Sequence, residues 1–121
     1  AQYEVNKLSA ELGNADVELV RKELGTEFDM IVHEPDGILE IGQAGHSKAS
    51  GIERLCAFLE IAKEDTYAFG DSANDVEMLE FVAHGIAMGN GTDVAKNAAE
   101  FITTDIHKDG IWNGLKHYGL I

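Results

Sequence analysis

Residues 67–79 read Tyr-Ala-Phe-Gly-Asp-Ser-Ala-Asn-Asp-Val-Glu-Met-Leu, and this stretch contains the change of pattern that decides the fold. The apolar run at 66–69 has the length and aromatic content of a buried strand, which Gly70 then ends. Beyond it the apolar residues follow helical spacing, with one side formed by Val76, Leu79 and Val82. A strand that turns directly into a helix is typical of an α/β sheet.

Two carboxylates, Asp71 and Asp75, lie on the turn between this strand and this helix. Ligands of α/β sheets bind outside the carboxyl ends of the strands, so both side chains are expected to face such a site. Carboxylate oxygens suit Mg²⁺, which binds one or two carboxylates together with water and phosphate oxygens. The spacing alone is equally compatible with Asp75 as a helix cap and Asp71 as an ordinary turn residue.

The segment from Gly70 to Asp75, followed by Met78 and Leu79, resembles the GDxxND motif of the haloacid dehalogenase (HAD) superfamily. Residues 47–52 resemble the lysine motif of the same superfamily. The resemblance is close from Gly45 onward, and it implies a Rossmann-like core domain with a parallel sheet. Further stretches are similar to the C-terminal end of Cof-type phosphatases, at 85–90, 94–99 and 109–111.

One motif of the family is missing from this sequence. HAD phosphatases carry an aspartate nucleophile and an acid/base aspartate in a DxDxT/V motif on the first strand, and this sequence contains no DxD pair. The resemblance therefore predicts the C-terminal portion of a phosphatase. In the family's sheet the first strand lies beside the strand expected at 65–70. We therefore expect the chain to recruit the missing N-terminal half, or a second copy of itself that exchanges elements with it.

The resemblance also implies a reaction. An intact enzyme of this kind hydrolyses a phosphomonoester through an aspartyl-phosphate intermediate with Mg²⁺, here on a small phosphorylated metabolite such as a sugar phosphate. Without the nucleophile, this chain alone is expected to be inactive. The alternative is a non-catalytic truncated fragment that binds Mg²⁺ or a complementary chain.

Lys48 stands at the start of a predicted helix, directly after Ser47, which can act as the N-cap. The helix dipole disfavours a cation at this end, so the position of Lys48 needs another reason unless it is an ordinary surface lysine. By resemblance, Lys48 is catalytic and neutralises the phosphoryl oxygens of the substrate.

The resemblance assigns the remaining site residues as well. It implies that Asp71 is a direct Mg²⁺ ligand and that Asp75 is a second ligand or one acting through water. Asn74 would bind substrate by donating a hydrogen bond to the phosphate, or it would fix Lys48. The alternative role for Asn74 is to cap the following helix.

The composition excludes several classes of partner. Among 121 residues, 9 are basic and 22 acidic, which gives a formal net charge of -13. Such a surface repels nucleic acid and anionic membranes. The single cysteine, Cys56, falls in a helical pattern with Ile52, Leu55 and Leu59 and is expected to be buried. No apolar run resembles a membrane span or a signal peptide, so we expect a soluble protein in the reducing cytoplasm.

The first part of the chain has a mixed α+β pattern that agrees with the tail of the cap domain inserted over the active site of Cof-type enzymes. A helix is predicted over 14–24, with Asn14 as N-cap and Gly25 as the stop. An edge strand is predicted within 1–8. Two further strands, at 28–33 and 38–41, are expected to be joined by a Pro-Asp-Gly turn at 34–37.

A glycine-containing connection at 42–45 is predicted to separate the cap part, 1–43, from the core part, 44–121. Beyond it helices and strands alternate, which favours a parallel, doubly wound sheet. We therefore predict an α/β fold consisting of the second half of the HAD core and the tail of an α+β cap. The expected core elements are helices at 48–61, 75–83, 92–99 and 109–118 and strands at 65–70, 85–89 and 100–103.

Overall fold

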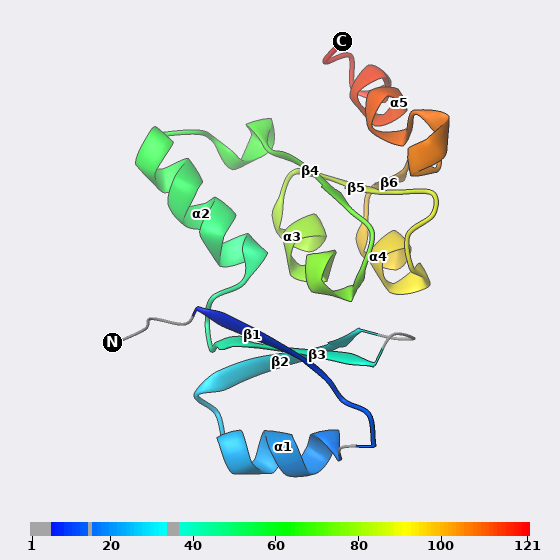
Figure 1. Ribbon diagram of the computed structural model, residues 1–121. Coiled ribbons are helices and arrows are strands. Elements are labelled where there is room, and N and C mark those ends of the chain that lie inside the picture. Colours follow the sequence, from blue (N-terminus) through cyan, green and yellow to red (C-terminus); the bar gives the residue numbers. More distant parts are fainter. Residues whose placement is uncertain (1–5, 15, 34–36) are drawn as a thin grey trace, which may run out of the picture. The chain divides into compact units, whose positions relative to one another are not determined.

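A computed structural model describes residues 6–14, 16–33 and 37–121 (Figure 1). The chain divides into two compact units, Ala1–His46 and Ser47–Ile121, which we call unit 1 and unit 2 and describe separately. In the described part of the chain, no helix has the length and apolar character needed to cross a membrane.

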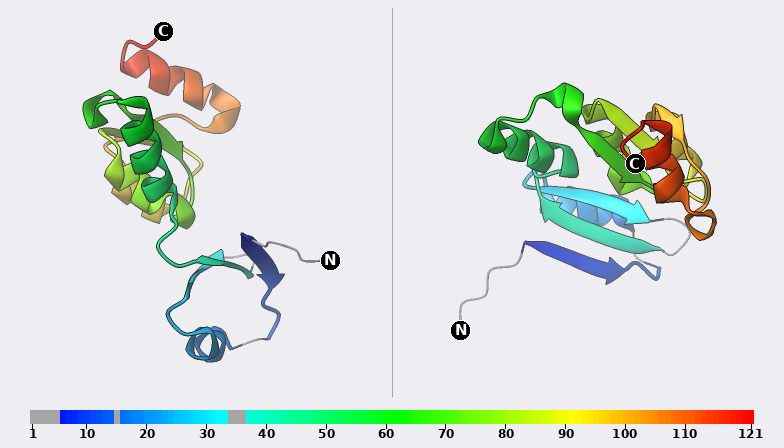
Figure 2. Two further views of the ribbon diagram at one scale, coloured as in Figure 1. Left: turned by 90° about the vertical axis from the view of Figure 1, so that its left-hand side faces the viewer. Right: turned by 90° about the horizontal axis from the view of Figure 1, so that it is seen from above.

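Unit 1 is a three-stranded antiparallel sheet with one helix, α1 (Val17–Leu24), beside it (Figures 1 and 2). The strand order is β1-β3-β2, so β1 and β2 are the edges and β3 is central. Met30 and Leu39 are buried and point to the same side of the sheet, since Met30 pairs with Ile41 and Leu39 with Val32. The strands are β1 (Lys7–Glu11), β2 (Phe28–His33) and β3 (Ile38–Gln43).

Helix α1 begins later than the sequence analysis predicted. Asn14 is not its N-cap: Asp16 occupies that position, and its carboxylate accepts the N–H groups of Glu18 at 3.0 Å and Leu19 at 3.3 Å. Aspartate at this position satisfies N–H groups that have no partner within the helix. The predicted stop is confirmed, since Gly25 caps the helix with a φ of 66°.

The strand predictions in unit 1 are confirmed for β2 and β3, although β3 is longer than expected. Strand β1 is an edge strand but runs over Lys7–Glu11 rather than within 1–8. Residues 1–5 and most of the predicted turn at 34–37 lie outside the described residues. Gly42 and Gln43 belong to β3 because they pair with Lys7 and Phe28, so the connection between the units starts at Ala44.

Unit 2 contains the predicted parallel sheet, with β5 between β4 and β6 (Figure 1). Each predicted element is present, mostly shortened at its ends, and the helix expected at 75–83 is a 3-10 turn followed by a short α-helix. The strands are β4 (Tyr67–Gly70), β5 (His84–Ala87) and β6 (Phe101–Ile102), and the helices are α2 (Lys48–Leu59), α3 (Val76–Phe81), α4 (Asp93–Ala98) and α5 (Gly110–His117). The 3-10 turns are Lys63–Asp65, Ala73–Asp75 and Ile106–Lys108.

The two faces of this sheet differ in side-chain size. One face carries Ala68, Gly70, Gly85 and Ala87, and it receives α3, whose Leu79 is only 2% exposed. A side chain on Gly85 would collide with the α3 backbone, because its Cβ would lie 2.3 Å from the carbonyl oxygen of Leu79. The opposite face carries the larger Tyr67, Phe69, His84 and Ile86, and α5 approaches it through Gly114, which lies against Phe69.

Helix α2 is the element whose packing the sequence did not predict correctly. All of it is described, and none of its side chains is buried. Cys56 is half-buried, and its predicted neighbours Leu55 and Leu59 are exposed. The expectation of a buried cysteine is wrong because the apolar face of α2 is not covered by the described residues.

Candidate active site at the end of strand β4

The candidate site lies on the turn that follows β4. The carbonyl oxygen of Asp71 accepts the N–H of Thr92 at 2.8 Å, and the carbonyl oxygen of Gly70 accepts the N–H of Met88 at 2.9 Å. These bonds tie the turn to the segment after β5, so the ends of two parallel strands meet here. This is where ligands bind in α/β sheets.

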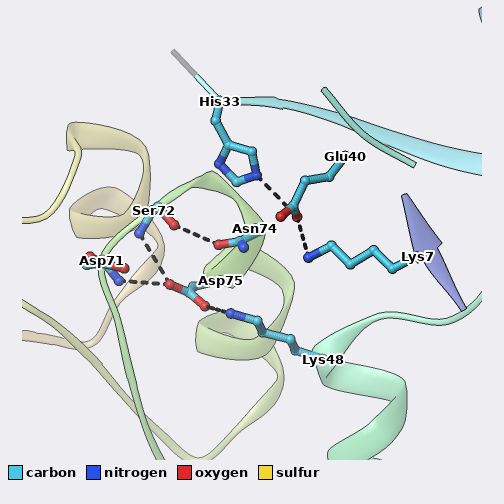
Figure 3. Close-up of polar contacts among 8 residues, drawn as sticks. All are labelled: Lys7, His33, Glu40, Lys48, Asp71, Ser72, Asn74 and Asp75. Carbon is cyan, nitrogen blue, oxygen red and sulfur yellow. Dashed lines mark hydrogen bonds and ion pairs between the residues drawn. The ribbon is translucent and has the colours of Figure 1, made fainter. Parts of the chain in front are cut away.

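Asp75 is the central residue of this turn (Figure 3). Its side chain is buried, and one carboxylate oxygen accepts the backbone N–H groups of Asp71 at 2.9 Å and Ser72 at 3.3 Å. The other oxygen accepts a hydrogen bond from the ammonium group of Lys48, which forms an ion pair with it. Asp75 therefore connects the end of β4 to the start of α2.

Burial acts to raise the pKa of the Asp75 carboxyl, because the charged form loses its hydration. The Lys48 ammonium and the N–H groups of Asp71 and Ser72 have the opposite effect, and together they outweigh burial. The pKa of Asp75 is therefore lowered from its ordinary value. Asp75 is held as a carboxylate by the groups around it.

Lys48 is the first residue of α2, and Ser47 is the N-cap as predicted. The Ser47 hydroxyl accepts the N–H of Ser50 at 3.3 Å, and the Ser50 hydroxyl accepts the N–H of Ser47 at 3.0 Å. The Lys48 side chain remains 48% exposed although it is paired with Asp75. The Lys48 side chain therefore stays partly accessible to solvent while it is paired with Asp75.

Asn74 makes a contact that differs from those predicted. Its side-chain oxygen accepts a hydrogen bond from the Ser72 hydroxyl at 2.6 Å (Figure 3). Among the described contacts, Asp75 rather than Asn74 fixes Lys48. The alternative role as a helix cap is also not seen, since α3 is preceded by Asp75 and starts without a side-chain cap. The Asn74 amide group remains a candidate donor to a phosphate oxygen.

Asp71 differs from Asp75 because its side chain is exposed, and none of the described hydrogen bonds or ion pairs involves its carboxylate. Within the described residues, no group of three or more Asp, Glu, His or Cys side chains is arranged to hold a metal ion. Mg²⁺, however, needs only one or two carboxylates when waters and phosphate oxygens complete its shell. The donors present therefore fit a Mg²⁺ ion held by Asp71 and by oxygens from outside this chain.

Unit 1 carries a polar cluster that the sequence did not predict. Figure 3 draws its three residues and marks the contacts between them with dashed lines. Glu40 on β3 accepts from the Lys7 ammonium on β1 at 2.7 Å, and its carboxylate lies 3.2 Å from Nε2 of His33 on β2. The hydrogen bond from Lys7 is the main reason why the pKa of Glu40 is lowered, and His33 adds to the effect. No local signal could reveal this cluster, because its residues come from three different strands.

A pocket of about 600 Å³ opens at one end of the unit 1 sheet. Among the described residues that line it, only Lys7 has an ammonium group, and their side chains form no arrangement suited to catalysis. We therefore place the candidate active site at the β4 turn and not in this pocket. The pocket is lined by Asn6, Lys7, Leu8, Glu27, Phe28, Ile41, Gly42, Gln43 and Ala44.

Comparison with known protein families gives a match over nearly the whole chain. The model of the haloacid dehalogenase-like hydrolases matches residues 2–115. An uncharacterized protein of Geobacillus stearothermophilus is 51% identical over 78 residues, which are 64% of this chain and 82% of that protein. YitU of Bacillus subtilis, a 5-amino-6-(5-phospho-D-ribitylamino)uracil phosphatase, is 40% identical over 84 residues, 69% of this chain and 31% of YitU.

Solved structures give the same picture. The structure of a sugar phosphatase of HAD subclass IIB superposes with a TM-score of 0.88 and is 29% identical. The match covers 98% of this chain and 45% of that structure. The chain thus spans less than half the length of YitU and of this solved structure.

Proposed function

Because this chain belongs to the haloacid dehalogenase-like hydrolases, as a Cof-type member of the HAD superfamily, we propose that it supplies one part of the active site of a phosphomonoesterase. The observation that carries the proposal is the meeting of Lys48, Asp71 and Asp75 at the carboxyl end of β4. An acidic protein with a net charge of -13 binds an anionic phosphate ester only where positive charge is supplied locally. Here Lys48 and a Mg²⁺ ion held by Asp71 would supply that charge at one strand end.

Each residue then has a role in binding the phosphoryl group. Lys48 neutralises charge on its oxygens, and the N-terminus of α2 adds a favourable dipole. Asn74 donates a hydrogen bond to the phosphate without adding charge. Asp71 is a direct ligand of Mg²⁺, and Asp75 is a second ligand or acts through water. The metal, when bound, neutralises phosphate charge as a Lewis acid.

The chemical step requires a group that this chain does not contain. The 121 residues of this sequence contain no DxD pair, so the aspartate that would form the aspartyl-phosphate has to come from outside them. We propose the N-terminal half of such a phosphatase as the source of this aspartate. The alternative partner, a second copy of this chain that exchanges elements with it, could complete the sheet but has no DxD pair either. The alternative to an enzyme part is a non-catalytic truncated fragment that binds Mg²⁺ or a complementary chain.

We propose a small phosphorylated metabolite, in the first place a sugar phosphate, as the substrate of the completed enzyme. Two relatives support this choice: one is a sugar phosphatase, and the other acts on a phosphorylated ribityl compound. Both substrates carry a phosphate group on a polyhydroxylated carbon chain.

The test is hydrolysis of p-nitrophenyl phosphate and a panel of sugar phosphates, with and without Mg²⁺. The chain alone should show no turnover above background. A hybrid in which the N-terminal part of YitU precedes this chain should be active with Mg²⁺ only. Losing a member of the catalytic group costs several orders of magnitude in rate, so Lys48→Ala should abolish the hybrid's activity.

Two results would contradict the proposal. The first is robust turnover by the pure chain that Lys48→Ala abolishes, since the nucleophile would then lie within this chain. The second is a folded hybrid with no activity on any phosphomonoester, which would favour the non-catalytic alternative.

A further inference from the structure

The exposed carboxylate of Asp71 is placed by the backbone that carries it. The described hydrogen bonds of this residue involve only its N–H and its carbonyl oxygen. The N–H donates to the Asp75 carboxylate at 2.9 Å, and the carbonyl oxygen accepts the N–H of Thr92 at 2.8 Å. Thr92 ends residues 88–92, which connect β5 to α4 and which we call the β5 loop. The position of the Asp71 carboxylate therefore depends on a segment that follows a different strand.

The β5 loop lies very close to the backbone of Asp71. A Cβ on Gly91 would lie 3.0 Å from the carbonyl oxygen and 3.1 Å from the Cα of Asp71. It would also lie 2.9 Å from the carbonyl oxygen of Met88 in the loop itself. Contacts this short with backbone atoms are not relieved by a change of rotamer, so the loop or the turn has to shift. Glycine at position 91 therefore allows the loop to reach Asp71.

The side chain of Asn90 holds the other side of the β5 loop. Its oxygen accepts the N–H of Ile106 at 2.9 Å, in the 3-10 turn that follows β6. The backbone adds one bond, from the N–H of Gly89 to the carbonyl oxygen of Thr104 at 3.1 Å. None of the described hydrogen bonds joins Asn90 to Asp71. Any effect of Asn90 on Asp71 therefore has to pass through the loop.

We propose that Asn90 and Gly91 are positioning residues of the metal site, which hold the β5 loop against the turn after β4 and so place the Asp71 carboxylate for Mg²⁺. Mg²⁺ demands nearly ideal octahedral geometry, so a displaced carboxylate binds it less well. The metal part of this statement rests on the proposed function. The contacts between the loop and Asp71 do not, and they can be tested on the chain as it is.

The first experiment titrates Mg²⁺ into Gly91→Ala and Gly114→Ala by calorimetry. Gly114→Ala is the matched control, because its methyl group would lie 2.5 Å from Cε1 of Phe69 under α5, and no described contact joins this position to Asp71. Mg²⁺ should bind several-fold more weakly to Gly91→Ala and as in the wild type to Gly114→Ala. Wild-type affinity in Gly91→Ala would overturn the proposal. An equal loss in both variants would do the same, since affinity would then follow stability.

Amide hydrogen exchange tests Asn90 without any metal. Asn90→Ala removes the acceptor of the Ile106 N–H, and the Thr92 amide responds only if the loop also leaves Asp71. Exchange at Thr92 should be about threefold to tenfold faster, as expected for the weakening of one hydrogen bond, beyond any change at the buried Ile86 in β5. Faster exchange at Ile106 alone would overturn the proposal, because Asn90 would then hold only the segment after β6.

Two further variants separate the acceptor from the rest of the side chain. Asn90→Asp keeps an oxygen that can accept the Ile106 N–H, so it should restore slow exchange at Thr92. Asn97→Ala removes the same kind of side chain from an exposed position on α4 that makes none of the described side-chain hydrogen bonds, and it should leave Thr92 unchanged. Fast exchange at Thr92 in Asn90→Asp, or in Asn97→Ala, would contradict the assigned role of the Asn90 oxygen.

The last measurement uses the wild-type chain and so does not depend on whether a variant folds. Coupling between two sites is reciprocal, so Mg²⁺ bound at Asp71 should slow the exchange of the Thr92 amide. Unchanged exchange at Thr92 while calorimetry shows Mg²⁺ bound would overturn the proposal. Absence of Mg²⁺ binding to the wild type would count against the metal site of the proposed function, and exchange at Thr92 in Asn90→Ala would then decide whether the loop positions Asp71.

Discussion

Asp71 and Asp75 lie on one turn, yet their carboxylates have different surroundings. Asp75 is buried and accepts three hydrogen bonds, whereas Asp71 is exposed and its backbone, not its carboxylate, makes the described contacts. A hard cation such as Mg²⁺ favours an accessible carboxylate that can be joined by water. At the residue scale, the difference between the two acids therefore predicts different consequences for their substitution.

We expect Asp71→Asn to weaken Mg²⁺ binding to the chain, because the accessible carboxylate is replaced by a neutral amide. Affinity in the wild type should itself be weak, since the nucleophile aspartate is absent. Titration calorimetry on both proteins checks this expectation. Equal Mg²⁺ affinity in wild type and Asp71→Asn would remove Asp71 from the metal site.

A second residue-scale prediction concerns Gly70. In Gly70→Ala the new methyl group would lie 2.6 Å from the Cβ of Asp75 and 3.1 Å from Cδ1 of Leu79, so the packing around it has to shift. Overpacking of this kind typically costs about 1–3 kcal/mol in the free energy of unfolding, measured by urea denaturation.

Gly51→Ala is the matched control for that substitution. Gly51 lies within α2, and a Cβ there would meet nothing within 4 Å. Alanine in a helix interior is favoured over glycine by roughly 0.5–1 kcal/mol, so this variant should be slightly more stable than the wild type. A Gly70→Ala protein as stable as Gly51→Ala would contradict the close approach of Asp75 to the strand.

At the scale of elements, periodicity and capping signals located the helices and strands of unit 2 but not their ends. Strand β4 ends at Gly70 as predicted, whereas the following helix is shortened by the 3-10 turn at 73–75. In that turn Asp75 folds back to the N–H groups of Asp71 and Ser72 and forms a capping box with Ser72, a local arrangement that apolar spacing alone does not show. In unit 1, the predicted N-cap Asn14 is wrong by two residues, since the carboxylate of Asp16 accepts the N–H groups of Glu18 and Leu19 at the start of α1.

The stability of the unit 1 sheet should depend on pH because of the Glu40 carboxyl group. Its pKa is lowered in the folded chain by Lys7 and then His33, so the folded state binds fewer protons than the unfolded state near that pKa. The resulting stability is present above the ordinary glutamate pKa and is lost as pH falls through the lowered value. Protection factors of amides in β1 and β3 should therefore fall on acidification in the wild type and fall less in Glu40→Gln.

Glu11→Gln serves as the control for that experiment. Glu11 is at the end of β1, and none of the described ion pairs includes it. Its substitution removes the same charge from the same sheet and should leave the acid dependence of the amides as in the wild type. An identical acid dependence in wild type and Glu40→Gln would show that the Lys7–Glu40–His33 cluster does not stabilise the sheet.

At the scale of the whole molecule, the described residues leave apolar surface and a strand edge without a partner in unit 2. In the described part of the chain, β4 pairs only with β5, and Phe58 on α2 is 83% exposed, with Leu55 and Leu59 exposed beside it. Burying one such side chain stabilises a protein by roughly 1.5–3 kcal/mol, while a whole domain is stable by only about 5–15 kcal/mol. The chain therefore has much to gain from a partner that covers α2 and pairs with β4.

We accordingly predict that the chain is not a stable monomer in solution. Light scattering should give a mass above 13.1 kDa, and mass spectrometry of the same sample should distinguish a second copy from a companion polypeptide. Phe58→Glu should weaken the association, whereas Val94→Glu, which changes an exposed apolar residue on α4, should not. A well-folded monomer of 13.1 kDa with cooperative unfolding would refute this prediction.

The sequence by itself determined the alternation of strands and helices after Ser47, the turn that carries Asp71 and Asp75, and the N-cap that begins α2. These features depend on residues close together in the chain, so periodicity and turn chemistry are enough to predict them. Only the tertiary structure decided that Lys48 pairs with Asp75, that Glu40 joins Lys7 and His33, and that the apolar face of α2 is uncovered. Such contacts join residues far apart in the chain, and they follow from strand register and helix packing, which no short stretch of sequence specifies.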